Sequence, residues 1–362
     1  MPFCKDMPRF FLGANAPKGY YSKFDQLLSY KPGARCFLLK GGPGTGKSTV
    51  LKKVAAALNE KGLSTELIYC SADIESLDAV LTSDGSFSVL DATLPHSVEP
   101  KYPGAYEETI ELGDCWDNSK LVENSEKIMG LFNRNRELHE RGRRYISAAA
   151  NLLDEAARLS LSEISQDKAA KAATRICAKE LHKTTKSQGK EKIRFLSAIT
   201  GDGVTMFDDT AKLLCGRIYV VDDDCGAVSR IFMNTVRKIA LEKGYDIITC
   251  RCSVFPQEKN EHILIPEAGV GFMTSNKRHT ISTKPYRMIH AKRFVNKEKS
   301  GKTKMKIKFT IRAANELIKE ASLCMKEAKT VHDELEKIYI SAMDFSLVDE
   351  KQNKILEAVS KL

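Results

Sequence analysis

One nine-residue segment, GGPGTGKST at residues 41–49, combines glycines with a lysine and two adjacent hydroxyl side chains. Glycine allows the backbone to pass close to a ligand, so that consecutive N–H groups can surround an oxyanion. A lysine at position 47 suits the terminal phosphates of a nucleotide, and a hydroxyl at position 48 suits Mg²⁺. We therefore expect Lys47 to bind the β- and γ-phosphates and Ser48 to ligate the metal.

The residues around this segment supply the context that such chemistry requires. The run RCFLL at 35–39 is typical of a buried strand, and STVLKKVAAALNEKG at 48–62 has helical apolar spacing. A glycine at position 62 is placed to end that helix. The segment satisfies the pattern G-x-x-x-x-G-K-[ST] between a strand and a helix, where the helix dipole also favours an anion. The expected nucleotide-binding residues are Gly41, Gly42, Pro43, Gly44, Thr45, Gly46, Lys47, Ser48 and Thr49.

A Mg²⁺ site also needs a carboxylate at the end of a neighbouring strand. Asp91 follows the short apolar run FSVL at 87–90, and ligands bind at the carboxyl ends of strands in open α/β sheets. Asp73, which follows the run TELIYCS, is the weaker candidate. We expect Asp91 to act with Lys47 in the catalytic site.

A group that orients a water molecule is harder to find. Many ATPases with such a glycine-rich loop carry a glutamate directly after the strand aspartate. In this sequence the residue after Asp91 is Ala92. His96, Glu75 and Asp78 are the nearby alternatives, and His96 is the candidate for a base or a substrate contact. The missing glutamate favours slow hydrolysis, transfer to another acceptor, or activation by a partner.

The chain repeats this frame with an offset of 182 residues. Eight residues between positions 35 and 71 recur in register, including the run EKG and the pair CS. We interpret this as an internal duplication, with halves at about 1–190 and 191–362. The eight are Arg35, Gly44, Val54, Glu60, Lys61, Gly62, Cys70 and Ser71.

The second copy lacks the chemistry of the first loop. The ungapped alignment places Ser229 opposite Lys47 and Arg230 opposite Ser48, and DDD at 222–224 replaces KGG at 40–42. Three carboxylates repel a phosphate, and without glycines the backbone cannot approach it. We expect a degenerate nucleotide site. The alternative is that the acidic cluster binds a cation or accepts a basic side chain from the other half.

Each half continues into a helical segment. Residues 118–190 contain no proline and have helical apolar spacing, and residues 305–362 are similar. The fold class predicted is α/β, with two tandem three-layer P-loop-like domains that have parallel sheets and helical extensions, joined by a linker at 186–192. We expect five arginines of the first helical segment to lie on a solvated helix face. The alternative is that one of them enters the nucleotide site as an arginine finger. They are Arg134, Arg136, Arg141, Arg143 and Arg144.

The positive charge of the chain is local. Net charge is +10, but residues 275–312 carry thirteen Lys or Arg and one acid. The corresponding stretch of the first half is acidic. We slightly favour the interpretation that the two stretches face each other or that the basic one pairs with small anions. The alternative is that residues 275–312 bind nucleic acid or another polyanion. The acids are Glu99, Glu107, Glu108, Glu111, Asp114 and Asp117.

Composition favours a cytoplasmic protein. The apolar fraction is 42%, apolar runs are too short to cross a membrane, and residues 1–21 do not resemble a signal peptide. The ten cysteines show no metal-ligand spacing, and several lie in apolar runs. We expect them to be reduced core residues. The oligomeric state is left open.

Residues 35–62 resemble the P-loop nucleoside triphosphatase superfamily. The segments CSADIESLDAVL, VLDATLPHSVEPKYPGAYEETIELGD and AMDF, together with the duplication, make nearly the whole chain similar to uncharacterised bacterial ATP-binding proteins with two tandem P-loop units. That resemblance implies ATP binding at residues 41–49 and use of Mg²⁺. The second unit of that group commonly keeps a glycine-rich loop, and this sequence departs there.

Three functions are compatible with these features. The first is a Mg²⁺-dependent ATPase with one competent site in the first half. The second is a small-molecule kinase whose acceptor contacts His96 and Lys101. The third is a binding module in which ATP controls the basic stretch at 275–312.

Overall fold

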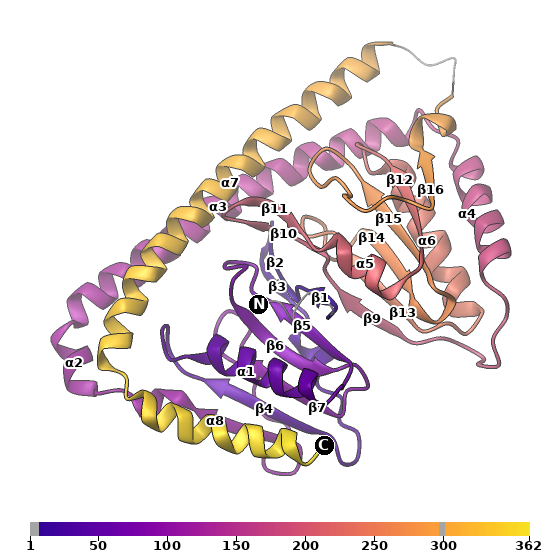
Figure 1. Cartoon of the computed structure of the whole chain (residues 1–362). Coiled ribbons are helices and arrows are strands. Elements are labelled where there is room, and N and C mark those ends of the chain that lie inside the picture. The colour runs from indigo at the N-terminus through magenta and orange to yellow at the C-terminus, as the bar shows by residue number, and fades with distance from the viewer. Residues whose placement is uncertain (1–6, 297–300) are drawn as a thin grey trace. The chain divides into compact units, whose positions relative to one another are not determined.

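The structure is a computed structural model that describes residues 7–296 and 301–362, with side chains from 303 in the second range (Figure 1). The first half of the chain forms eight strands and four α-helices in order. These elements are β1 (Arg9–Phe10), β2 (Gly13–Ala16), β3 (Gly19–Ser22), η2 (Phe24–Leu27), β4 (Arg35–Lys40), α1 (Lys47–Glu60), β5 (Thr65–Tyr69), β6 (Leu77–Thr82), β7 (Phe87–Asp91), β8 (Glu107–Glu111), η3 (Leu112–Cys115), α2 (Asn118–Glu123), α3 (Ser125–Leu161) and α4 (Gln166–Glu180).

The second half repeats the strand order of the first, with eight further strands. Its elements are β9 (Glu191–Arg194), β10 (Ser197–Thr200), β11 (Gly203–Met206), α5 (Asp208–Leu214), β12 (Arg217–Asp222), α6 (Ala227–Glu242), β13 (Ile247–Arg251), β14 (Asn260–Ile265), η4 (Pro266–Ala268), β15 (Val270–Ser275), β16 (Arg287–His290), η5 (Ala291–Phe294), α7 (Gly301–Ala342) and α8 (Phe345–Ser360).

Both halves build a six-stranded sheet with the same topology. The orders are β1-β5-β6-β7-β4-β8 and β9-β13-β14-β15-β12-β16, the second read from its other edge. In each sheet three neighbouring pairs are parallel and two are antiparallel. The prediction of an α/β fold is therefore confirmed, and that of parallel sheets holds only in part, because both sheets are mixed. The reason is that β6 and β14 are joined to both flanking strands by connections too short for a parallel crossover.

The compact units of the structure do not follow the predicted division at residue 190. One unit contains 1–13, 22–142 and 323–362, and the other contains 14–21 and 143–322. Two of the four boundaries fall inside the long helices α3 and α7, and the other two fall within β2 and β3. Each unit therefore holds one sheet together with the last helix of the other half.

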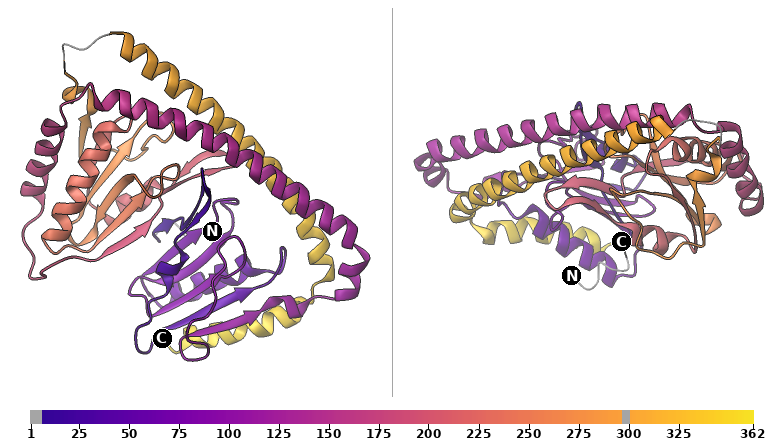
Figure 2. Two further views of the ribbon diagram at one scale, coloured as in Figure 1. Left: turned by 180° about the vertical axis from the view of Figure 1, so that it is seen from behind. Right: turned by 90° about the horizontal axis from the view of Figure 1, so that it is seen from above.

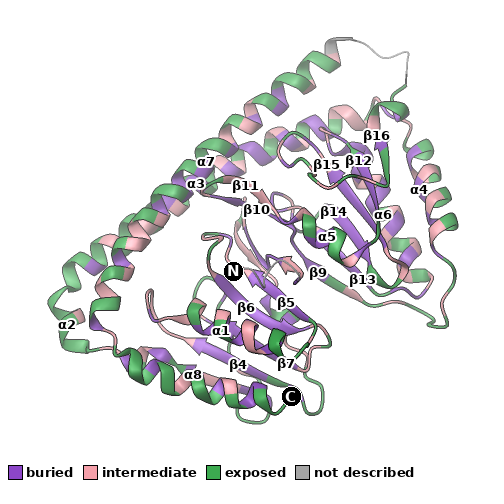
Figure 3. Cartoon of the chain, viewed as in Figure 1, coloured by how far each residue is buried: buried purple, intermediate pink, exposed green. Residues whose placement is uncertain are grey.

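In the first unit, α1 and α8 cover one face of the sheet. Phe37 and Leu39 on β4 lie in this core, while the intervening Leu38 faces the other side, as expected for alternating strand residues. Ile355 on α8 is 0% exposed and packs in the same cluster as the α1 residue Val54. Figure 3 shows the buried stripe along α8. An Asp344 carboxylate that accepts the N–H of Ser346 caps this helix.

In the second unit, α4 takes the position that α8 has in the first. It packs against α6, and its Ala169, Ala173 and Cys177 are fully buried beside Phe232. Its N-cap is Ser165, whose hydroxyl accepts the N–H of Lys168. Small residues allow α4 to approach α6 closely.

Backbone contacts attach these helices to the sheets they cover. In the first unit Trp116 pairs with Met343, and the N–H of Asp344 donates to the Cys115 carbonyl at 2.7 Å. In the second unit, Ile164 pairs with Val295. Within the first unit, the end of α7 also runs beside the start of α3 (Figure 2), where Asn135 donates to Ala328.

No helix within residues 7–296 and 301–362 has the length and apolar character that spanning a bilayer requires.

Burial of α8 against α1 leads to a stability prediction. Ile355→Ala should lower the free energy of unfolding of the first unit by about 2–5 kcal/mol, because it leaves a cavity between α8 and the sheet. Leu347→Ala on the exposed side of the same helix should cost no more than about 0.5 kcal/mol. Urea denaturation of both variants measures the difference. Equal losses would contradict the packing of α8 on this sheet.

Candidate functional site

The glycine-rich loop joins the end of β4 to the start of α1. Three of its glycines have positive φ: 155° at Gly41, 68° at Gly44 and 87° at Gly46. The last is the N-cap of α1, which begins at Lys47. These left-handed conformations account for the glycines, because other residues are strained there.

Lys47 lies across the loop. Its Nζ atom donates to the carbonyl oxygens of Gly41 at 2.9 Å and Gly42 at 2.8 Å, and is 3.7 Å from Oδ2 of Asp91. The Thr45 hydroxyl also donates to the Gly42 carbonyl. The structure therefore brings Lys47 and Asp91 together, as the sequence predicted.

Asp91 and Ser48, the two expected metal ligands, each have further hydrogen-bond partners. Asp91 is the last residue of β7, which pairs directly with β4, and its Oδ1 accepts hydrogen bonds from the N–H and hydroxyl of Thr93. Oγ of Ser48 accepts the N–H of Leu77 at 3.1 Å. Oδ2 of Asp91 faces the lysine.

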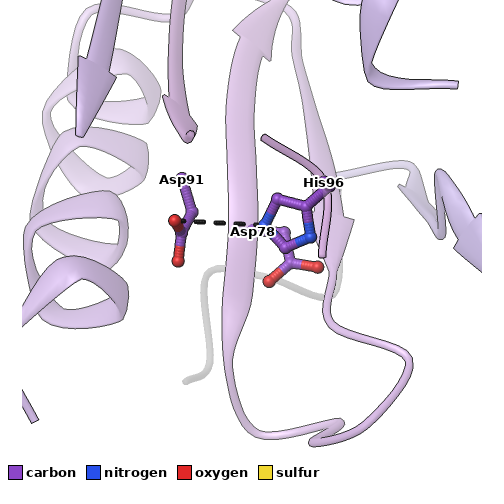
Figure 4. A group of neighbouring side chains, drawn as sticks. All are labelled: Asp78, Asp91 and His96. Carbon is purple, nitrogen blue, oxygen red and sulfur yellow. Dashed lines mark ion pairs between the residues drawn. The ribbon is translucent and has the colours of Figure 1, made fainter. Parts of the chain in front are cut away.

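Two further side chains complete the group, as Figure 4 shows. The β6–β7 register places Asp78 opposite Asp91, and His96 Nε2 lies 3.9 Å from Asp91 Oδ1. One ligand atom from each of the three lies within 4.8 Å of the others, close enough to share a metal ion. The His96 ring stacks on Phe24 at a centroid distance of 4.3 Å.

Burial controls the protonation of this group. Desolvation, followed by the charge of Asp91, raises the pKa of Asp78 well above its ordinary value. Desolvation lowers the pKa of His96, although the Asp91 charge opposes the shift. Asp78 is therefore protonated more readily than a free carboxyl, and His96 is neutral at pH 7. A cation beside Asp78 would favour its ionised form.

The end of α7 covers part of the loop. A β-carbon on Gly42 would lie 3.2 Å from the Tyr339 ring and 3.3 Å from the Trp116 ring, and one on Gly44 would lie 2.9 Å from the carbonyl oxygen of Glu336. Sequence reasoning missed these neighbours, which are separated from the loop by up to 300 residues. A signal for Asp78 does exist, since it is the one charge in the apolar strand LDAVLT.

The weaker candidates have other partners. Asp73 accepts hydrogen bonds from the N–H of Glu75 and the hydroxyl of Ser76 in a turn, and forms an ion pair with Lys329 at 3.4 Å. Glu75 is exposed. The Lys101 ammonium lies over the rings of Tyr30 and Tyr102.

Two of the arginine-finger candidates have partners on the long helices, away from the loop. Arg134 pairs with Glu327, and Arg136 donates to Asn133.

The acidic residues of the first half are paired within their own unit. Glu99 lies 2.6 Å from Lys40, Glu108 binds Arg35, and Asp114 binds Lys351. Glu107 accepts the backbone N–H groups of Lys101 and Tyr102, and Asp117 caps α2. The expectation that this stretch faces the basic stretch at 275–312, which lies in the other unit, stays a prediction. Residues 297–300 of that stretch lie outside the described residues.

The second half replaces the glycine-rich loop with a shorter one. Gly226, with φ of 77°, is the N-cap of α6, as Gly46 is of α1. The ungapped alignment, which paired Gly226 with Gly44, is therefore wrong at this point, because four residues rather than six separate strand from helix. Asp223 is buried, and its carboxylate accepts the N–H groups of Cys225 and Ser229. A side chain of the protein thus binds the N–H groups that an anion would use.

The other two aspartates also have partners. Asp222 lies 3.0 Å from Nδ1 of His290, and Asp224 accepts the N–H of Lys277. Both partners belong to the same unit as the three aspartates at 222–224.

A second buried charged group lies at the strand positions that match Asp78 and Asp91, with a histidine five residues beyond the second strand position in each half. Glu261, Thr274 and His279 occupy the matching positions. Glu261 is 0% exposed and lies 2.8 Å from Lys259 Nζ and 3.4 Å from His279 Nε2. The lysine of this group lies just before β14, whereas Lys47 lies at the start of α1.

Electrostatics hold this second group in its charged form. Burial by itself would raise the pKa of Glu261, but Lys259 and His279 hold it well below its ordinary value of 4.5. Burial lowers the pKa of the neighbouring His262 to about 3, so this imidazole is neutral, and its Nδ1 accepts the N–H of Thr274. The Glu261 carboxyl is therefore ionised at physiological pH, 2.8 Å from the Lys259 Nζ atom.

Comparison of the chain with protein-family models, with curated proteins and with solved structures returned no match. The function must therefore be argued from the geometry of the site.

Removal of the buried carboxylate gives a pH-dependent prediction. Glu261→Gln should lower the free energy of unfolding by about 3 kcal/mol near pH 7, because it leaves the Lys259 ammonium buried without its counter-ion. The folded-state pKa of Glu261 is depressed, so its contribution is present above pH 4.5 and is lost as pH falls through the folded value. The difference between wild type and variant should shrink in acid.

Urea denaturation at several pH values between 3 and 7 tests this expectation. Glu316→Gln is the matched control, since Glu316 pairs with Lys319 on an exposed helix face and should show no measurable loss. A constant difference across this pH range would contradict the assignment.

Proposed function

We propose that this protein is a Mg²⁺-dependent ATP-binding protein, and an ATPase, with one competent site in its first half. The observation that carries the proposal is the convergence of Lys47 and Asp91 at the carboxyl ends of two adjacent parallel strands, beside a loop with three left-handed glycines. This arrangement of an ammonium, a carboxylate and the N–H groups of a helix start suits a nucleoside triphosphate with its metal.

Each residue has a distinct part in this proposal. Lys47 exchanges its hydrogen bonds to the Gly41 and Gly42 carbonyls for the phosphate oxygens. Gly44 and Gly46 keep the backbone close to the phosphates. Trp116 and the end of α7 pack against the same loop and restrict its movement.

The donor set fits Mg²⁺. The cation prefers oxygen ligands and keeps several of its waters, and the Ser48 hydroxyl and the Asp91 carboxylate supply such ligands. Bound there, Mg²⁺ would neutralise charge on the phosphate oxygens. His96 is the less suitable member of the group, because Mg²⁺ is a hard cation that favours oxygen over imidazole nitrogen.

Asp78 is the residue we assign to water. The position after Asp91 is the buried Ala92, which has no polar side chain, whereas Asp78 lies directly across from Asp91. Cationic charge in the site would ionise its carboxyl, which then accepts the proton of an attacking water. Hydrolysis is therefore coupled to metal binding.

The second half is not proposed as a second ATP site. The Asp223 carboxylate accepts the N–H groups at the start of α6, so a triphosphate would meet a negative charge there. In the second half, the residue that corresponds to Asp91 is Thr274, which has no carboxylate.

Titration calorimetry with Mg·ATP tests the proposal. Wild type should bind about one nucleotide per chain, and Lys47→Ala should lose binding because the ammonium no longer meets the phosphates. The single tryptophan, Trp116, should report the same event by fluorescence, since it lies against Gly42.

Lys53→Ala provides the matched control for this titration. Lys53 lies on the same helix with a half-exposed side chain that pairs with Asp349, and its removal should leave ATP affinity unchanged. Two bound nucleotides per chain, or binding that survives Lys47→Ala, would sink the single-site proposal.

Substitution of Asp78 separates binding from hydrolysis. Asp78→Asn should keep Mg·ATP affinity within a few-fold and lower phosphate release roughly 100- to 1,000-fold, because the amide cannot accept a proton from water. Asp73→Asn, which alters a carboxylate held in a turn, should leave the rate within a few-fold. Phosphate release with and without Mg²⁺ measures both. The assignment fails if Asp73→Asn gives the larger loss.

A further inference from the structure

The basic stretch of the second half ends in the first turns of α7. Between residues 301 and 315 this helix contains five Lys or Arg and no Asp or Glu, and its first acid is Glu316. The N-terminus of a helix already carries partial positive charge, so basic side chains there destabilise the helix slightly. Their concentration at this end of α7 is therefore not explained by the stability of the helix.

Helical periodicity gathers basic and apolar side chains on one exposed face of α7. Met305 and Phe309, four residues apart, form an apolar stripe, and they are 69% and 62% exposed. The opposite face is buried, with Ile311 at 8% and Ile318 at 4% (Figure 3). The exposed residues of this surface, named here the α7 face, are Lys304, Met305, Lys306, Lys308, Phe309 and Arg312.

The charges of the α7 face are not neutralised by the described part of the chain. Its four basic side chains form no ion pair there, and the first pair along α7 joins Lys319 to Glu316. Four more exposed basic side chains without an ion pair among the described residues precede the helix in the same compact unit. They add to the positive potential around it, and are Lys284, Arg287, Lys292 and Arg293.

Exposed apolar side chains are concentrated in the same segment. Of the seventeen large apolar side chains that are exposed among the described residues, five lie between residues 286 and 309. Such a concentration indicates an interaction surface rather than single exposed residues. Besides Met305 and Phe309, they are Tyr286, Met288 and Val295.

The chemistry of the α7 face favours a lipid surface over a nucleic acid or a protein. Met305 has no ring and cannot stack on a base, as the aromatic side chains of single-strand-binding proteins do. Lysine, which supplies three of the four charges, is depleted at protein–protein interfaces. An anionic bilayer suits both kinds of side chain, because its head groups attract ammonium groups and its acyl boundary accepts apolar ones.

We propose that the α7 face binds the surface of an anionic phospholipid bilayer. Met305 and Phe309 enter the boundary between head groups and acyl chains, and the basic side chains on either side of them meet the lipid phosphates. This contact is peripheral and spans nothing. It goes beyond the proposed ATPase and does not depend on it.

Co-sedimentation of the full chain with vesicles tests the proposal. The protein should bind vesicles of equal parts phosphatidylglycerol and phosphatidylcholine at least about tenfold more tightly than vesicles of phosphatidylcholine alone. Concentrated salt should weaken this binding, because it screens exposed charges. Lys47→Ala should bind like wild type, which separates this surface from the ATP site.

Removal of the apolar stripe tests the insertion. Met305→Ser with Phe309→Ser should weaken binding to the anionic vesicles about tenfold or more, since two apolar side chains no longer enter the bilayer. The matched control is Met129→Ser with Phe132→Ser, which removes the same residue types from an exposed part of α3, where they are 59% and 45% exposed. The control should bind like wild type.

Removal of charge tests the electrostatic part. Lys304→Ala with Lys308→Ala should weaken binding about tenfold or more, because each basic residue near an anionic bilayer contributes to affinity. Lys168→Ala with Lys171→Ala on α4 changes net charge equally from two exposed positions and should have a much smaller effect. Circular dichroism confirms that each variant is folded.

Three results would overturn the proposal. The first is equal affinity for anionic and neutral vesicles, or no binding to either. The second is a loss in each control pair as large as in its test pair, which would show that the α7 face has no special part. The third is salt-sensitive binding of an oligonucleotide by a protein that does not bind the vesicles, which would assign these charges to nucleic acid.

Discussion

The structure depends on an exchange of apolar surface between the two halves of the chain. Each sheet has one face that its own crossover helix covers only in part, and the remaining surface is covered by a helix from the other half. Ile355 and Val359 of α8 fill this space in the first unit, and Ala173 and Cys177 of α4 fill it in the second. Because burial of such faces is the main stabilising contribution to folding, neither sheet reaches its full core from its own half alone.

The same exchange places the end of α7 against the glycine-rich loop. Gly42 and Gly44 approach Tyr339 and the Glu336 carbonyl so closely that a β-carbon would collide with or crowd them. The residues that would hold the phosphates are thus in contact with the helix that leads into α8. Within this unit, any movement of the loop must be accommodated by that helix, since packed surfaces do not deform freely.

Each half contains a buried carboxylate with a histidine and a lysine nearby, and the electrostatics of the two groups differ. In the first half, Asp78 faces Asp91 and its pKa is raised. In the second half, Glu261 is bound by Lys259 and its pKa is lowered. The carboxylates occupy matching strand positions, whereas the lysine lies at the start of α1 in the first half and just before β14 in the second. The first group therefore has two carboxylates beside one lysine, and the second pairs one carboxylate with one lysine.

The sequence by itself predicted the α/β class, the strand–loop–helix frame at residues 35–62 and the position of Asp91 at the end of a strand, because these depend on local periodicity and on residues adjacent to strand ends. It also predicted a second strand–loop–helix frame that lacks the glycines of the first. Only the tertiary structure decided that β6 and β14 run antiparallel, that α4 and α8 lie on the opposite half's sheet, and that Asp78 faces Asp91. Strand direction and helix placement follow from contacts between distant residues, and the amphipathic pattern of a helix states that it has an apolar face without stating which surface that face covers.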